Sequence, residues 1–183
     1  MNALKLLSVS ALLLLLWGCD SVTSSALVGE NPVSLVAEEW DGIWLGAEAA
    51  VILQVVDAKQ GGLRAAWIER SGGALKTEIW LVQIRSSGSW IFANVKDDEA
   101  TDRSAERYLF SRLKKDDDQI LFWLPSTSAF TKAVEAGHLP GEIEDSNVRL
   151  SNLSASHLEV VKSEKGQALF DWDEPMVLLR VRN

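Results

Sequence analysis

Side chains with catalytic or metal-binding chemistry are few in this sequence, and they stand apart from one another. His138 and His157 lie 19 positions apart, and neither belongs to the H-E-x-x-H spacing that places two imidazoles on one helix face for zinc. The sequence also lacks the Gly-x-Ser-x-Gly turn that would present a serine nucleophile to a base. These residue types predict neither catalytic residues nor metal ligands, and we expect no enzyme activity and no cofactor.

Two runs of carboxylates, Asp97-Asp98-Glu99 and Asp116-Asp117-Asp118, offer the oxygen ligands that Ca²⁺ prefers. Consecutive carboxylates in a hairpin point in different directions, and the spaced D-x-D-x-D-G loop of a calcium site is missing. Both runs are therefore interpreted as solvated turns. A glycosidase-like pair of carboxylates stays open as an alternative, because 26 Asp and Glu residues cannot be sorted without distances.

Cys19 is the only cysteine, and it directly follows an apolar run and a small residue. One positive charge, Lys5, precedes an apolar stretch from Leu6 to Trp17 that is interrupted only by serines. This stretch is shorter than the ~20 residues of a membrane-spanning helix and has the size of a signal peptide. We therefore predict a cleaved signal peptide over residues 1–18. A single thiol also excludes an internal disulfide.

Leu16-Trp17-Gly18-Cys19 resembles the lipobox of bacterial lipoproteins, in which a small residue precedes the cysteine. The resemblance implies that Cys19 is lipidated on its thiol and becomes the new N-terminus, which anchors the protein to a membrane of the bacterial cell envelope, facing the periplasm. Asp20 resembles the signal that retains lipoproteins in the inner membrane of enteric bacteria, so we expect the inner rather than the outer membrane. An ordinary cleaved signal peptide with an incidental cysteine is the alternative.

Composition narrows the choice of partners. The chain of 183 residues has 18 Lys and Arg against 26 Asp and Glu, a net charge of −8. Affinity for nucleic acid comes mainly from Lys and Arg contacts to the phosphate backbone, so we expect no nucleic-acid partner for this acidic protein.

Residues 19–38 are rich in Ser and have no sustained periodicity, which predicts a lipidated N-terminus followed by a flexible tether. The remainder, residues 39–183, is long enough for one domain.

Short segments rich in Val, Ile or Trp recur through this domain, and each predicts a strand. They cover residues 41–45, 49–56, 63–69, 76–85, 90–95, 107–114, 119–124, 148–150 and 176–182. Most of the connections are too short for a parallel crossover, so an antiparallel meander is predicted. Two short helices are expected in the C-terminal third, one over about 126–136 and one from Ser154 or Ser156 to Gly166. The fold class is thus mainly β (α+β), with about eight or nine strands.

Gly42-Ile43-Trp44 resembles the Gly-x-Trp signature of lipocalins, in which the tryptophan plugs the closed end of an antiparallel barrel. In that family a C-terminal arginine packs across the ring, and Arg180 or Arg182 is the counterpart that the resemblance implies. The implied fold is a lipocalin-like barrel or a strongly curved sheet. An ordinary core tryptophan is the alternative for Trp44, because Gly88-Ser89-Trp90 matches the same short pattern.

Residues 107–181 resemble small bacterial envelope lipoproteins of uncharacterised function. The resemblance implies a fold and a location in the cell envelope but no activity. Four tryptophans lie on different predicted strands, at Trp67, Trp80, Trp90 and Trp123. They would either line an interior pocket or fill the interior.

Two functions follow from these observations. The first is a membrane-anchored, non-enzymatic binding or interaction module that contacts an envelope protein. The alternative is a lipocalin-like carrier of a small hydrophobic ligand. The two differ in whether the barrel interior is packed or open.

Overall fold

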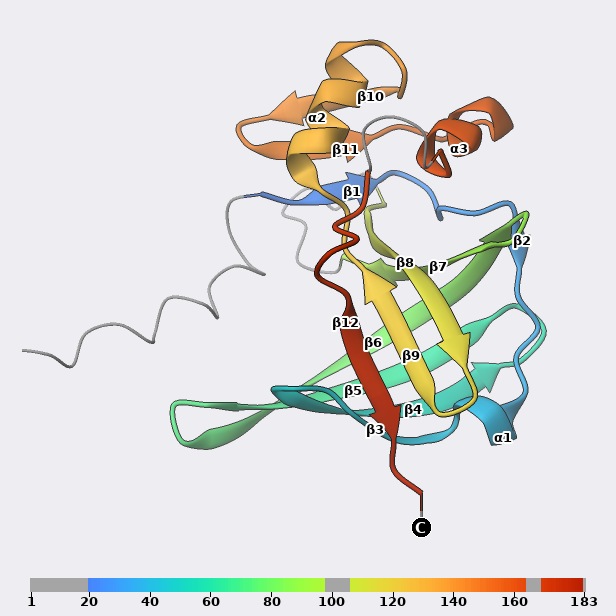
Figure 1. The fold of residues 1–183 in the computed structure, drawn as a ribbon, viewed down its shortest axis with the longest axis vertical. Coiled ribbons are helices and arrows are strands. Elements are labelled where there is room, and N and C mark those ends of the chain that lie inside the picture. Colours follow the sequence, from blue (N-terminus) through green and yellow to red (C-terminus); the bar gives the residue numbers. More distant parts are fainter. Residues whose placement is uncertain (1–19, 98–105, 164–168, 183) are drawn as a thin grey trace, which may run out of the picture.

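The computed structural model describes residues 20–97, 106–163 and 169–182. Eight strands form a closed antiparallel barrel (Figure 1). They are β3 (Gly42–Leu45), β4 (Ala49–Asp57), β5 (Gly62–Ser71), β6 (Ala74–Ser87), β7 (Trp90–Lys96), β8 (Tyr108–Asp116), β9 (Gln119–Trp123) and β12 (Met176–Arg180). From β3 to β9 each strand pairs with the next, and β12 closes the ring between β9 and β3. The predicted mainly β meander is therefore confirmed.

Strand β7 shows how alternation builds the barrel wall. Ile91, Ala93 and Val95 pack against the interior core, whereas Trp90 and Phe92 belong to a second core outside the barrel. Successive side chains of a strand point to opposite faces of the sheet. The large apolar side chains on the outer face of β7 are buried, so β7 contacts an outer layer as well as the barrel interior.

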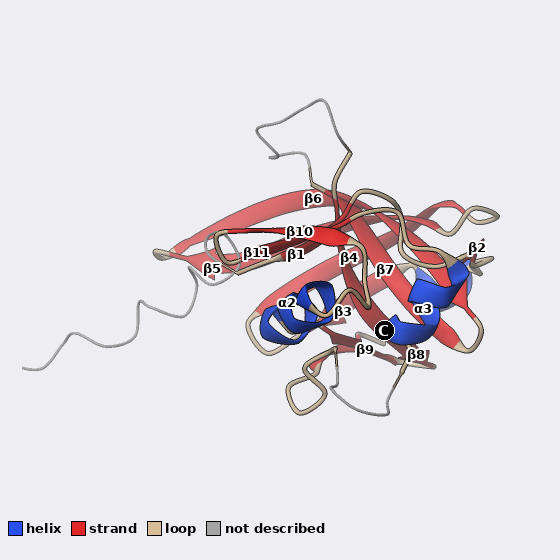
Figure 2. Ribbon diagram, turned by 90° about the horizontal axis from the view of Figure 1, so that it is seen from above, coloured by secondary structure: helices blue, strands red, loops and turns tan. Residues whose placement is uncertain are grey.

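The outer layer covers β7, β8 and β9 and lies above the barrel in Figure 1. Its elements are β1 (Val22–Ser24), β10 (Gly141–Glu144), β11 (Asn147–Leu150), α2 (Thr127–Glu135) and α3 (Ala155–Val161). Figure 2 shows α2 and α3 on the same side of the barrel. Strand β1 pairs antiparallel with β8 and parallel with β11, so the small sheet continues from the barrel wall. Phe130 of α2 meets Phe110 of β8 edge to face, with ring centroids 5.8 Å apart.

The two helices predicted for the C-terminal third are present as α2 and α3. Helix α3 ends at Val161, earlier than the predicted end at Gly166. Val161 is the last buried residue of α3 and the following Ser163 is exposed, so the helix has no further apolar face to bury. Gly166 itself lies outside the described residues. A third helix, the single turn α1 (Ala37–Trp40), was not predicted.

Residues 20–38 do not form the predicted tether, and for this segment the prediction is wrong. Strand β1 is buried over its whole length, and β2 (Asn31–Pro32) pairs with β6. Val28 and Leu35 are 1% and 4% exposed. Apolar residues spaced among serines give no helix or strand periodicity, yet Val22 and Val28 pack in the outer core and Leu35 packs in the barrel core. The domain therefore includes Asp20 and the residues after it, while Cys19 and the signal peptide lie outside the described residues.

Candidate ligand-binding cavity

One end of the barrel is closed around Trp44, which is fully buried within the short strand β3. Its indole Nε1 donates to the carbonyl of Trp40 in α1 at 2.9 Å. The Arg180 guanidinium lies 5.6 Å from the centroid of the Trp44 ring. Nη2 of Arg180 also donates to the carbonyls of Glu38 at 2.8 Å and Asp41 at 2.7 Å. These contacts fasten the α1 turn to β12 and close this end.

The two arginines considered for this end have different surroundings. Arg182 forms an ion pair with Asp118 in the turn between β8 and β9, and its side chain is 76% exposed. Only Arg180 lies against the tryptophan ring. Gly42 has a φ of +140°, a backbone conformation that side chains disfavour, which explains a glycine two residues before Trp44.

Beyond this closed end the barrel interior holds a cavity of about 260 Å³. Its deeper wall is formed by aliphatic side chains, among them Leu53, Leu63, Ile84, Leu113, Ile120 and Leu178. All six are at most 7% exposed. The volume is slightly below the usual range of about 300–1,000 Å³ for ligand pockets, so the occupant must be small or extend through the mouth.

The other end of the barrel forms the mouth, where polar and aromatic side chains replace the aliphatic ones. Trp67 of β5 and Trp80 of β6 line the cavity there, with ring centroids 5.7 Å apart and planes tilted by 33°. The Trp67 indole donates to Glu69 Oε2 at 3.1 Å. Lys76 Nζ lies 2.5 Å from Glu78 Oε1, and all three charged residues belong to the lining. The cavity thus has an apolar interior and a charged rim.

The other two tryptophans considered for a pocket, Trp90 and Trp123, lie outside the barrel in the outer core. There the Arg112 guanidinium lies 4.0 Å from the ring centroid of Trp90 and 4.5 Å from that of Trp172. This arrangement stabilises the layer over β8 and β9 through cation–π contacts. Periodicity alone could not separate the two pairs of tryptophans, because both faces of the wall are apolar.

A second hollow, of about 450 Å³, lies on the outside, between residues 25–30, the start of β8 and α3. Within it the Tyr108 hydroxyl donates to Glu106 Oε2 at 2.9 Å. This hydrogen bond, followed by the contact with Lys96, lowers the pKa of the Glu106 carboxyl. Burial, followed by the same hydrogen bond, raises the pKa of Tyr108. Glu106 and Tyr108 thus satisfy each other, and the hollow has a mixed lining in which Leu27, Leu153 and Leu158 lie beside charged residues.

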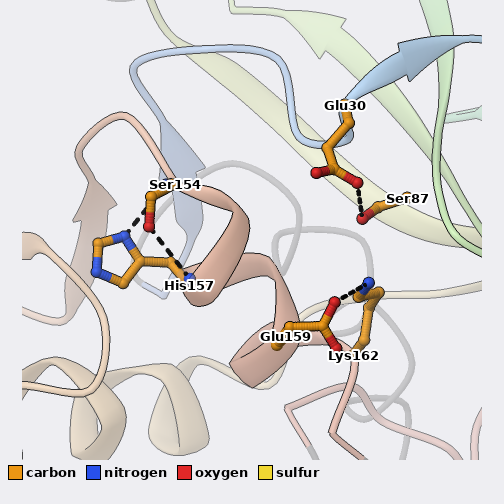
Figure 3. Close-up of polar contacts among 6 residues, drawn as sticks. All are labelled: Glu30, Ser87, Ser154, His157, Glu159 and Lys162. Atoms are coloured by element: carbon orange, nitrogen blue, oxygen red, sulfur yellow. Dashed lines mark hydrogen bonds and ion pairs between the residues drawn. The ribbon is translucent and has the colours of Figure 1, made fainter.

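Ser154 and His157 lie side by side near this hollow, yet their geometry is that of a helix cap (Figure 3). The backbone N–H of His157 donates to Ser154 Oγ at 3.3 Å, and the backbone N–H of Ser154 donates to His157 Nδ1 at 3.2 Å. The imidazole Nδ1 thus accepts from the backbone of Ser154, while Ser154 Oγ accepts from the backbone of His157 and lies 2.8 Å from Ser156 Oγ. The pair reproduces a capping box and does not create an activated nucleophile.

The remaining candidate residues do not converge. His138 is exposed in the loop after α2. Asp116 is exposed as the last residue of β8 and Asp117 in the turn that follows, and Asp98 and Glu99 lie outside the described residues. Within the described ranges, no group of three or more His, Cys, Asp or Glu is placed to hold a metal ion.

Fold and cavity define the class of protein: a closed eight-stranded antiparallel barrel with an apolar interior that opens at one end. No family model matches the chain, and no curated protein or solved structure matches it. Among the residues that the structure describes, no helix is long and apolar enough to cross a membrane. The likeness to bacterial lipoproteins and lipocalins therefore stays a prediction from sequence.

Proposed function

We propose that this protein binds a small hydrophobic molecule inside its barrel. The observation that supports the proposal is the cavity of about 260 Å³, with an aliphatic lining below the Trp67–Trp80 pair. Apolar cavities of about 150 Å³ stay dry and take up apolar guests such as benzene. Removing apolar surface from water then supplies the affinity, at roughly 25 cal/mol per Å² before the costs of association. Of the two functions predicted from sequence, the geometry thus favours the carrier.

The proposal includes a lipid anchor at Cys19 in the bacterial cell envelope, based on the lipobox-like sequence. The neighbouring Asp20 accepts a hydrogen bond from Thr127 Oγ1 through its carbonyl at 3.2 Å. Thr127 follows Leu124, a cavity-lining residue at the mouth, by three positions. An anchor at Cys19 would therefore attach the barrel to the membrane near its mouth, where an apolar ligand could pass between bilayer and cavity.

Interaction with an envelope protein is the second candidate, and the outer wall of the barrel favours it. Leu75, Ile79 and Leu81 of β6 are 75%, 65% and 61% exposed. Ile43 and Ile52, paired with each other on β3 and β4, are 46% and 42% exposed. Contiguous apolar surface of this kind is typical of contact sites.

Neighbouring alanines on β5 give a matched test of ligand binding in the barrel. Ala65 is 4% exposed and lines the cavity, whereas Ala66 points to the other face. In a titration with the neutral probe N-phenyl-1-naphthylamine, wild type is expected to saturate. Ala65→Phe should weaken binding by about tenfold or more because the ring occupies the cavity, and Ala66→Phe should leave it unchanged.

Circular dichroism would establish that both variants keep the fold. Absence of saturable binding by wild type would contradict the proposal, and so would equal binding by the Ala65→Phe variant.

A further inference from the structure

The charged groups at the mouth do not balance. Glu69 and Glu78 supply two carboxylates to the cavity lining, and Lys76 supplies one ammonium group. In the register between β5 and β6, Glu69 stands directly opposite Lys76, and Trp67 stands opposite Glu78. The three charges therefore form one cluster on adjacent strands, with a net charge of −1. The end of any ligand that fills the cavity lies beside this cluster.

The positions of these charges favour a positive ligand. The Glu78 side chain is 22% exposed and the Lys76 side chain is 55% exposed, so the carboxylate is the more shielded from water. Glu69 is also partly buried and receives the indole hydrogen bond of Trp67. Charges interact more strongly where water is excluded. A cation at the mouth would be attracted to the shielded carboxylates, whereas an anion would be repelled by them.

The two indoles beside the carboxylates add a second, independent attraction. Trp67 and Trp80 both line the cavity, and their rings are partly exposed within it. The face of an aromatic ring attracts ammonium groups, and tryptophan does so best. Sites that recognise quaternary ammonium ligands combine such rings.

Several exposed acidic residues lie around the same end of the barrel. Glu48 is exposed in the turn between β3 and β4, and Asp173 and Glu174 are exposed just before β12 begins. Arg70, exposed near the end of β5, is an opposing charge on this rim outside the lining. The rim thus extends the negative potential of the cluster toward solvent, which would steer cations to the mouth.

From this arrangement we infer that the ligand is a small amphiphile with a cationic amine or quaternary ammonium head and an apolar tail. The inference rests on the proposed function. The tail occupies the aliphatic cavity, and the head lies between the Trp67 and Trp80 rings and the carboxylates of Glu69 and Glu78.

Three probes with the same tail separate the choices of head group: decyltrimethylammonium, decanol and decanoate, each titrated below its micelle concentration. Quenching of tryptophan fluorescence or calorimetry reports the Kd. Wild type is expected to bind decyltrimethylammonium about tenfold more tightly than decanoate, with decanol between them. Equal affinity for the three probes, or a preference for decanoate, would overturn the inference.

Charge-neutral variants test the residues named. Glu69→Gln and Glu78→Gln should each reduce the preference for the cation over decanoate by about threefold, without changing the affinity for decanol. Lys76→Met should increase that preference. Glu142→Gln on β10, which removes an exposed carboxylate outside the cavity lining, is the matched control and should leave it unchanged.

The outcomes distinguish this inference from the proposed function. If N-phenyl-1-naphthylamine binds and is blocked by Ala65→Phe while the cation has no advantage, the barrel is a carrier and the inferred head group is wrong. If neither the naphthylamine nor any decyl probe binds, both fail together.

Discussion

Trp44 and Arg180 stabilise the closed end of the barrel, because their contacts join β3, α1 and β12. Trp44→Ala should lower the free energy of unfolding by roughly 3–5 kcal/mol, the usual cost of removing a buried aromatic side chain. Arg180→Ala should lower it by about 2 kcal/mol, because two backbone carbonyls lose a charged donor. A double-mutant cycle measured by urea unfolding should give a coupling of about 1 kcal/mol.

Arg182 provides the matched control for this cycle. Its ion pair with Asp118 is at the surface, so Arg182→Ala should change the free energy of unfolding by at most about 1 kcal/mol and show no coupling to Trp44. Additive effects of Trp44→Ala and Arg180→Ala would show that the ring and the guanidinium do not interact.

The sequence could indicate this contact only in part. The pattern Gly42-Ile43-Trp44 implied that one C-terminal arginine packs across the Trp44 ring. Arg180 and Arg182 are two positions apart, however, and therefore project to the same face of an extended chain. Only the register of β12 against β3, in which Arg180 pairs with Trp44, separates the two. Register between strands so distant along the chain depends on the whole barrel and cannot be derived from local spacing.

Asn94 fastens the N-terminal segment to the barrel wall. This side chain is 1% exposed on β7; its Oδ1 accepts from the backbone N–H of Val28 at 2.7 Å and its Nδ2 donates to the carbonyl of Val28 at 3.1 Å. Asn94→Ala should lower the free energy of unfolding by roughly 2–4 kcal/mol, because two buried backbone groups lose their partner. Amide hydrogen exchange of Val28 should accelerate by more than that of the barrel strands.

Asn152→Ala, which alters an exposed residue before α3, serves as the control and should be close to neutral. Unchanged exchange at Val28 in the Asn94→Ala variant would contradict the role assigned to Asn94.

At the level of elements, the strands of the barrel were predictable because their turns and alternation are local properties. The packing of residues 20–38 was not. A polar residue within the apolar run of β7 indicates that Asn94 has a specific hydrogen-bond partner. That partner, Val28, is 66 positions away along the chain. Serine is also common in loops, so the composition of residues 20–38 favoured a flexible tether over a packed segment.

The layout of the whole molecule follows from the two cores. The outer layer covers β7, β8 and β9 but leaves the outer wall of β3, β4 and β6 exposed, with apolar residues such as Ile52 and Ile79 at the surface. The closing strand β12 follows an insertion that includes α2, β10, β11 and α3. Closure of the barrel therefore depends on contacts between residues distant along the chain. For this reason the sequence alone could not distinguish a closed barrel from a strongly curved sheet.

The proposed anchor makes a prediction about the whole molecule in a bacterial host. Cys19→Ser should abolish incorporation of labelled palmitate and leave the chain unprocessed by the lipoprotein peptidase, because the thiol is the acceptor. Several acyl chains are needed for stable attachment, since one chain binds a membrane only marginally. Processing and fractionation of the Cys19→Ser variant like those of wild type would rule out the anchor.

Asp20→Ser tests sorting with the anchor kept. The contact of Asp20 with Thr127 is made by its main-chain carbonyl, so the substitution changes the side chain beside Cys19 and leaves this contact intact. In an enteric host, wild type should sediment with the inner membrane on a density gradient, and Asp20→Ser should move to the outer-membrane fraction. Sedimentation of both proteins with the outer membrane would remove the retention role of Asp20, while labelling at Cys19 would still support the lipoprotein assignment.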